Sequence, residues 1–140
     1  MLYNDSQLAK SERLPKSKIE TDSYVAAQLI EKYGRLDLKT IAKMSEAVEG
    51  SFVFTILSDK NKLFIAKGDN PLCLIHYKQL GLYVYTSTED IMKNVLKGSF
   101  LEKLPFEVIK VTEGEIISID KRGRFEKSSF VPNEFCYGWN

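Results

Sequence analysis

The spacing of the apolar residues changes at Ser51, from a period typical of helices to one typical of strands. Before Ser51, two segments carry apolar residues at the three- and four-residue spacing of amphipathic helices. After it come short runs rich in β-branched and aromatic residues, separated by polar or glycine-containing turns. Helices followed by a series of antiparallel hairpins predict an α+β fold and not a doubly wound α/β sheet.

Two helices are expected before the change of period. In segment 22–33 the apolar stripe ends at Gly34, a residue suited to a left-handed C-cap. In segment 37–48 Asp37 can cap the start, and Gly50 is expected to close the helix. The two stripes consist of Val25, Ala26, Leu29, Ile30 and Tyr33, and of Leu38, Ile41, Met44, Ala47 and Val48.

The second part of the chain predicts two hairpins, a short helix and a closing hairpin. Ser87 or Thr88 can cap that helix, which runs through Leu96 and has two acidic residues in its first turn. The turns are polar or contain glycine, as in "DKNK", "QLG" and "DKRGR". Strands are expected at 51–58, 63–67, 72–78, 82–87, 106–111 and 115–119, with a weaker strand near Phe125.

The runs "SFVFTIL" and "LCLIHY" are apolar on both strand faces. Because a strand with two apolar faces needs a cover on each side, these runs predict a layered arrangement of helix on sheet on sheet. Residues 1–128 are expected to hold this domain. The tail 129–140 is rich in aromatic residues without a clear period, so it is expected either to wrap over an exposed sheet or to fray.

Charge and cysteine content limit the classes of function. The net charge is +1 and the pI is about 7.7, which argues against nucleic acid or an acidic membrane as the main partner. Cys73 and Cys136 lie far apart, and His76 is the single histidine, so the sequence predicts free thiols, no metal site and no cofactor. Without a signal peptide or a membrane-spanning run, we expect a reducing, cytoplasmic location.

An ordered series of segments resembles a known family. It comprises "IETDSYVAAQLIEKYG", "LDLKTIAKMSEAVEGSFVFTIL", "GDNPLCL", "YVYTSTEDI" and "VTEGEIISID". From about Leu2 to Asp120, the chain resembles the later part of the class-II glutamine amidotransferase domain, an N-terminal nucleophile hydrolase. The resemblance implies a partial αββα sandwich of that type, with antiparallel sheets and two main helices.

The family's reaction is implied by the same resemblance. An N-terminal cysteine attacks the side-chain amide of glutamine with its own α-amine as base, which gives a glutamyl thioester and ammonia. The Asn-Gly pair that donates to the oxyanion immediately precedes the segment that "LYND" resembles. Residue one here is Met, and Leu2 is too bulky for routine removal of the initiator. The resemblance therefore implies a domain shortened at its N-terminus, without a catalytic residue and inactive alone.

Asp22 is the candidate substrate-binding residue. The resemblance aligns it with the aspartate that pairs with the α-ammonium group of substrate glutamine. Local sequence alone favours a capping role, because an acidic residue in the first helical turn, beside a capping Thr21, stabilises a helix by roughly 0.5–1 kcal/mol. Asn4 and Asp5 are expected to hold a turn, and His76 is expected to be a surface or satisfied residue and not a catalyst. Thr88 stands where members of the family often carry an acidic residue.

Two alternatives stay open. The first is a non-enzymatic assembly module, because removal of the family's first half would leave an uncovered sheet that favours a homodimer or another chain. That other chain could be the missing half or a separate synthase domain. The second is an independent α+β domain with an unrelated small ligand. The sequence does not define the acceptor of ammonia, since that specificity normally lies in the synthase domain.

Overall fold

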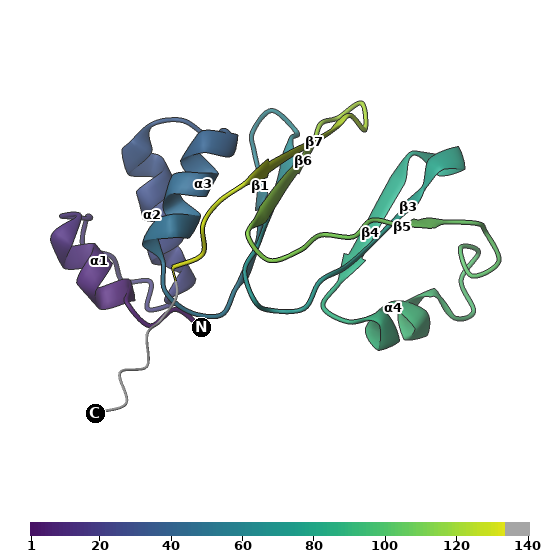
Figure 1. Cartoon of the computed structure of the whole chain (residues 1–140), viewed down its shortest axis with the longest axis horizontal. Coiled ribbons are helices and arrows are strands. Elements are labelled where there is room, and N and C mark those ends of the chain that lie inside the picture. The colour runs from purple at the N-terminus through teal and green to yellow at the C-terminus, as the bar shows by residue number, and fades with distance from the viewer. Residues whose placement is uncertain (134–140) are drawn as a thin grey trace.

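The computed structural model describes residues 1–133, which form four α-helices and two antiparallel sheets (Figure 1). The expectation of an α+β fold is confirmed. The last part of the predicted tail, with Phe135, Cys136, Tyr137 and Trp139, lies outside the described residues. Among the helices of residues 1–133, none is long and apolar enough to cross a membrane.

The two helices predicted before Ser51 are confirmed as α2 (Ser23–Tyr33) and α3 (Leu38–Ala47). Gly34 ends α2 with a φ of 77°, a conformation that costs glycine little. Asp37 caps α3 by accepting a 2.9 Å hydrogen bond from the Thr40 amide. Gly50 does not close α3, because the backbone is already extended at Val48, the C-cap.

A first helix, α1 (Asp5–Ser11), was not predicted. Asn4 and Asp5 were expected to hold a turn, but Asn4 is the N-cap of this helix and Asp5 is its first residue. Leu8 is its one buried residue. A helix of two turns with a single buried side chain leaves no repeating apolar stripe in the sequence, which explains why the pattern missed it.

The strands form two sheets with the orders β1-β2-β6-β7 and β4-β3-β5, and all their pairs are antiparallel. The hairpins β1-β2, β3-β4 and β6-β7 are confirmed. The predicted strand 106–111 is reduced to the two residues of β5, which pair with β3 and form no hairpin with β6. The strands are β1 (Val53–Leu57), β2 (Leu63–Lys67), β3 (Cys73–Tyr77), β4 (Leu82–Thr86), β5 (Glu107–Val108), β6 (Glu115–Ile119) and β7 (Phe125–Ser129).

Two short helical segments belong to the second sheet. A 3-10 turn, Lys78–Leu80, joins β3 to β4, where a turn was predicted. The helix α4 (Glu89–Leu96) follows β4, and Thr88 caps it by accepting a hydrogen bond from the Ile91 amide at 3.3 Å. The predicted helix and one of its two candidate caps are thus confirmed.

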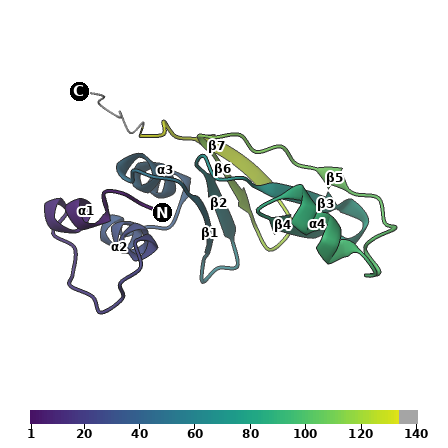
Figure 2. The same cartoon turned by 90° about the horizontal axis from the view of Figure 1, so that it is seen from below.

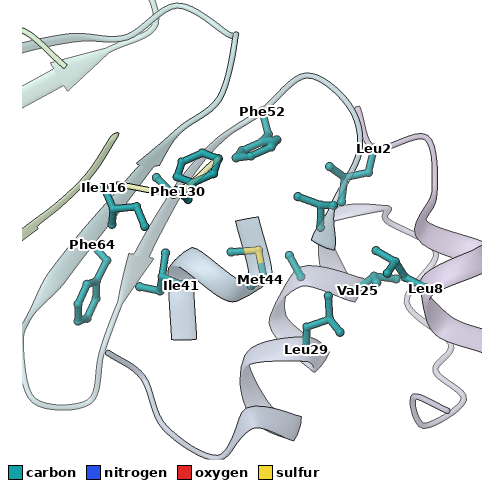
Figure 3. Close-up of a cluster of buried hydrophobic side chains, with 13 residues drawn as sticks. Leu2, Leu8, Val25, Leu29, Ile41, Met44, Phe52, Phe64, Ile116 and Phe130 are labelled. Carbon is teal, nitrogen blue, oxygen red and sulfur yellow. The ribbon is translucent and has the colours of Figure 1, made fainter. Parts of the chain in front are cut away.

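Three buried clusters show how the layers pack. In the first, α2 and α3 cover one face of the first sheet, through residues such as Leu29, Ile41 and Phe64 (Figure 3). In the second, Ile65 and Ile117 on the opposite face of that sheet meet Leu74 of the second sheet. The helices, the first sheet and the second sheet therefore follow one another in the predicted order (Figures 1 and 2).

The third cluster places α4 on the outer face of the second sheet. Ile75 and Tyr77 of β3 pack there against Met92 and Leu96 of α4. The core also continues past residue 128, because the buried Phe130 belongs to the first cluster, with its ring centroid 6.1 Å from that of Phe52. The helices of the first layer and α4 thus enclose the two sheets from opposite sides.

Candidate functional site

Asp22 stands at the start of α2, where its carboxylate accepts two backbone hydrogen bonds. One oxygen accepts from the amide of Ser23, the first residue of the helix, at 2.8 Å. The other accepts from the Leu2 amide at 2.5 Å, across 20 residues of sequence. Asp22 is itself the N-cap of α2, where the sequence predicted Thr21 as the cap and Asp22 in the first helical turn. The same carboxylate also fixes the N-terminal segment against α2.

The N-terminal segment is held on its other side by the loop that follows α3. Leu2 forms an isolated antiparallel bridge with Gly50. The Ser51 amide donates to the Met1 carbonyl at 3.0 Å, and the Met1 ammonium donates to the Ser51 carbonyl at 2.7 Å. The Tyr3 amide donates to the Glu49 carbonyl at 2.7 Å. Asp22 and Gly50 thus hold the same short piece of chain from two directions.

Gly50 is required for this close approach. Its φ is 131°, and a Cβ at this position would lie 2.2 Å from the Met1 carbonyl oxygen and 2.9 Å from the Leu2 Cα. Both contacts are with backbone atoms, which cannot rotate away as a side-chain end can. Only glycine therefore lets the N-terminal segment and the loop after α3 pack in this way.

Asn4 adds a third connection. Its side-chain amide donates to the Ala47 carbonyl at 2.9 Å, and its side-chain oxygen accepts from the Glu49 amide at 2.9 Å. The side chain is buried, and these two bonds satisfy polar groups at the end of α3 that the helix itself leaves open. Asn4 therefore has a positioning role in addition to its place at the start of α1.

The pKa of the Asp22 carboxyl lies below its usual value, chiefly because of the hydrogen bond from the Leu2 amide. The Ser23 amide and the terminal ammonium lower it further, and partial burial opposes them. Since the folded state holds the proton less tightly than the unfolded chain, this group stabilises the fold fully above the unfolded pKa of about 3.9. Its contribution is lost as the pH falls through the lowered pKa.

We expect acid to remove the stability difference between the wild-type chain and Asp22→Asn. The difference is largest near neutral pH and shrinks from about pH 4 downward, because a protonated Asp22 no longer offers the Leu2 amide a charged acceptor. Urea unfolding across this range measures the difference. The Leu2 amide resonance should shift over the same pH range, and an amide signal that does not move would contradict the assignment of Asp22 as its acceptor.

A cavity of about 230 Å³ adjoins the N-terminal segment. Asp69 and Glu113 line it with Tyr3 and Gly50, and the Ser51 hydroxyl donates to the Asp69 carboxylate at 2.7 Å. No Lys or Arg is among its lining residues, so it favours positively charged groups. Asp22 is not one of the lining residues. Asp22 is bonded to Leu2, and the next residue, Tyr3, lines the cavity.

A wider cavity of about 600 Å³ lies between α1, α2 and the chain that joins them. Thr21 and Tyr24, which neighbour Asp22 in sequence, line it together with Lys10 and Arg13. Asp22 does not line this cavity either.

The structure does not bring the cysteine and histidine candidates to Asp22. Cys73 belongs to β3 and packs with the α4 cluster, and burial, followed by nearby Glu89, raises the pKa of its thiol. Such a thiol is a poor nucleophile near neutral pH. His76 stacks on Tyr83 with 4.0 Å between ring centroids, as a satisfied side chain on the sheet. Within residues 1–133, no group of His, Cys, Asp and Glu could hold a metal ion.

Sequence reasoning found Asp22 but missed its closest connections. Asn4 was assigned to a turn and Gly50 to a helix end, whereas the structure uses both to hold the N-terminal segment. A helix-capping residue type before "DSQLAKS" was the available signal for Asn4. No signal for the role of Gly50 exists in its local sequence, because the role depends on its bridge with Leu2, which lies 48 residues earlier in the chain.

No family model matches the chain. Two curated proteins are similar to it, the 7-cyano-7-deazaguanine synthase 2 of Sulfurisphaera tokodaii and the 7-cyano-7-deazaguanine synthase of Sulfolobus acidocaldarius. Each is 25% identical over 116 residues, which make up 81% of this chain and 25% of the relative. The chain thus spans about a quarter of the length of the curated relatives it matches.

Among solved structures, the chain is similar to the glutamine phosphoribosylpyrophosphate amidotransferase of B. subtilis, which was complexed with ADP and GMP. The TM-score is 0.72 and the sequence identity is 23%, and the match covers 94% of this chain and 28% of the amidotransferase chain. The described chain therefore shares its fold with a part of that glutamine amidotransferase.

Proposed function

We propose that this chain forms the part of a class-II glutamine amidotransferase domain that binds the α-ammonium group of glutamine, with Asp22 as the binding carboxylate. The observation that carries the proposal is the position of Asp22. It is a partly exposed carboxylate with a lowered pKa, at a helix start, beside the N-terminal segment. The shared fold with an amidotransferase supports it.

Asp22 has acceptor capacity left for a ligand. An ionised carboxylate offers about four lone-pair positions, and the Ser23 and Leu2 amides use two of them. An ammonium group can donate to the remaining positions in charge-assisted hydrogen bonds, which are among the stronger polar contacts in proteins. Because the carboxylate is ionised at neutral pH, it needs no conformational or protonation change to accept this group.

The 140-residue chain is not proposed to hydrolyse glutamine. The family's reaction needs a thiolate at a chain terminus, which attacks the amide carbon while the amide nitrogen takes up a proton and leaves as ammonia. Cys73 has a raised pKa and packs against the α4 cluster, whereas Asp22 lies at the start of α2, and Cys136 is not at a terminus with a free amine. The role of this chain in that reaction is therefore to bind and to orient the substrate.

The proposal also covers the fold type, the substrate and the place of the ammonia acceptor. We assign the predicted domain, with its C-terminal boundary moved from residue 128 to at least Phe130, to a partial αββα sandwich of the N-terminal nucleophile hydrolase type, with the layers described above as support. Glutamine is the substrate, and the acceptor of ammonia belongs to protein outside this domain. The match to synthases over about a quarter of their length is consistent with such a division of labour.

The test is a titration of the labelled chain with L-glutamine, followed by amide NMR. We expect shifts at Leu2, Asp22 and Ser23, and we expect Asp22→Asn to weaken binding about tenfold or more, since a hydrogen bond to a charged group contributes about 1.5–3 kcal/mol. Asparagine is as good an N-cap as aspartate, so this variant keeps the helix start, but it loses the charge and one of the two oxygens that accept the Ser23 and Leu2 amides.

Asp37→Asn is the matched control. Asp37 is also an N-cap aspartate with a lowered pKa that accepts a backbone amide, but it caps α3 instead of holding the N-terminal segment. This variant should bind glutamine as the wild type does. Glutaramate, which is glutamine without the α-amino group, should leave the Asp22 region unchanged. Equal weakening by the two variants, or equal shifts with glutaramate, would rule out Asp22 as the ammonium partner.

A second candidate function is assembly, favoured by exposed apolar side chains at the second sheet and α4. Leu82, Tyr85, Ile91 and Val95 are all exposed. Exposed apolar side chains beside a strand edge favour association with another polypeptide. This function needs no catalysis. It can coexist with glutamine binding, because these residues lie in the second sheet and on α4, whereas Asp22 lies at the start of α2.

A further inference from the structure

The strand β1 is an edge of the first sheet that is open to a further strand. All five of its residues, Val53–Leu57, pair with β2 in a ladder without a bulge, and no strand of residues 1–133 pairs with its other side. Its sequence "VFTIL" contains no charged residue and no proline, the usual protections of an edge. The opposite edge, β7, carries Glu126 and Lys127, which both form ion pairs. Of the two edges, β1 is therefore the one that can take a strand without burying a charge.

The hydrogen bonds around β1 show which of its residues face the open side. Before the strand, the Gly68 amide donates to the Phe52 carbonyl at 3.0 Å. After it, the Ser58 amide donates to the Lys62 carbonyl at 2.9 Å. Because backbone groups alternate along a strand, the even-numbered residues of β1 also bond to β2. The odd-numbered residues point their amides and carbonyls to the open side, and these are Val53, Thr55 and Leu57.

The N-terminal segment already begins a ladder on that side. The Ser51 amide donates to the Met1 carbonyl and the Met1 ammonium to the Ser51 carbonyl, as in a hydrogen-bonded antiparallel pair. The Tyr3 amide bonds to the Glu49 carbonyl in the same ladder. Glu49 and Ser51 are odd-numbered, like the residues of β1 that face the open side. Figure 1 shows the N-terminus beside the chain that leads into β1. A chain that continues back from Met1 therefore runs along the open edge.

We propose that β1 is the pairing site for an antiparallel strand that leads into Met1 in a longer polypeptide. This inference rests on the proposed function, in which the chain is part of a larger domain. The Met1 nitrogen is then a peptide amide, which donates the same bond to Ser51 as the ammonium does. Each step back from Met1 advances one residue along β1. The second and fourth residues before Met1 therefore exchange hydrogen bonds with Val53 and Thr55.

The link to Met1 selects this strand over other extended chains. An unprotected edge alone accepts any strand, but a segment attached to Met1 is held at the first rung of the ladder, at an effective concentration of about millimolar. The side chains of β1 add a second criterion. Phe54 and Ile56 pack against the cluster below the helices, so the third and fifth residues before Met1, which lie opposite them, are expected to be apolar.

The test adds the extension Thr-Val-Thr-Val-Thr-Ser before Met1 and measures amide hydrogen exchange by NMR. Its two valines stand at the fifth and third positions before Met1. The amides of Val53 and Thr55 should exchange about tenfold more slowly, or slower still, than in the 140-residue chain, because each gains an acceptor. The amides of Phe54 and Ile56 bond to β2 and should be protected in both chains, so they show that the sheet itself is intact.

The matched control is the same extension with proline as the second and fourth residues before Met1. Proline has no amide hydrogen to donate to the carbonyls of Val53 and Thr55, so these amides should exchange as fast as in the 140-residue chain. The free peptide Thr-Val-Thr-Val-Thr-Ser at about 100 μM should have no effect either, because it lacks the link to Met1. Protection by the peptide or by the proline extension contradicts the inference, and so does a failure of the first extension to protect.

Glutamine binding is measured separately, on the chain without an extension. Slow exchange at Val53 and Thr55 without glutamine-dependent shifts at Asp22 would overturn the proposed binding role of Asp22 and leave the pairing site of β1 in place. Shifts at Asp22 without slower exchange in the extended chain would overturn the pairing site alone.

Discussion

A Phe64→Ala variant is expected to lose about 3–5 kcal/mol of unfolding free energy, the range for removal of a buried aromatic side chain. Phe64 is 2% exposed and lies in β2, the central strand on which α3 packs (Figure 3). Its ring fills space between the helical layer and the first sheet, and an alanine would leave a cavity that rigid neighbours on both sides cannot fill. Urea unfolding at neutral pH measures the loss.

Phe100→Ala is the control for that prediction. Phe100 is also a phenylalanine, but its side chain is 77% exposed. The free energy of unfolding of Phe100→Ala should therefore lie within about 0.5 kcal/mol of the wild-type value. Similar losses for the two variants would show that the ring of Phe64 is not part of the core. A loss at Phe64 alone would support the packing of helices on the first sheet.

A Gly50→Ala variant is expected to lose about 2–3 kcal/mol and to displace the N-terminal segment. The added Cβ would collide with the Met1 carbonyl, and the φ of 131° is unfavourable for alanine. Because the Leu2 amide would move with that carbonyl, its hydrogen bond to Asp22 should weaken as well. Urea unfolding gives the stability, and the chemical shift of the Leu2 amide reports the displacement.

Gly34→Ala separates the effect of the positive φ from the effect of the collision between the new Cβ and the backbone. Gly34 also has a positive φ, 77°, but no atom lies within 4 Å of the place of its missing Cβ. Its variant should therefore lose only the conformational cost of about 1 kcal/mol and leave the Leu2 amide in place. If both glycine variants lost the same stability and neither moved the Leu2 amide, the close approach at Gly50 would have no energetic role.

The local elements were predictable because each carries its own signal. The stripe of α2 ends at Gly34, Asp37 is an N-cap residue before the stripe of α3, and Thr88 precedes the acidic first turn of α4. The hairpins follow from short apolar runs around polar turns. The same holds for the layers, since strands with two apolar faces need cover on both sides.

The arrangement of the candidate site was less predictable, because it depends on contacts between distant segments. The local sequence indicates that Asp22 lies at the start of a helix, where it can bond to a nearby amide such as that of Ser23. Its bond to the Leu2 amide depends instead on where the N-terminal segment lies. Gly50 and Asn4 act through the same segment. The spacing of residues within one element contains no information on such a meeting, and the positions of the two cavities likewise follow from tertiary packing alone.

The second sheet and α4 are formed by one continuous segment of the chain that connects two neighbouring strands of the first sheet, β2 and β6. Lys67 at the end of β2 pairs with Glu115 at the start of β6, and everything between these residues lies in or beside the second sheet. Closing that loop has an entropic cost that the tight hairpins β1-β2, β3-β4 and β6-β7 avoid. Docking of β6 onto β2 should therefore limit the rate of folding, after the local hairpins have formed.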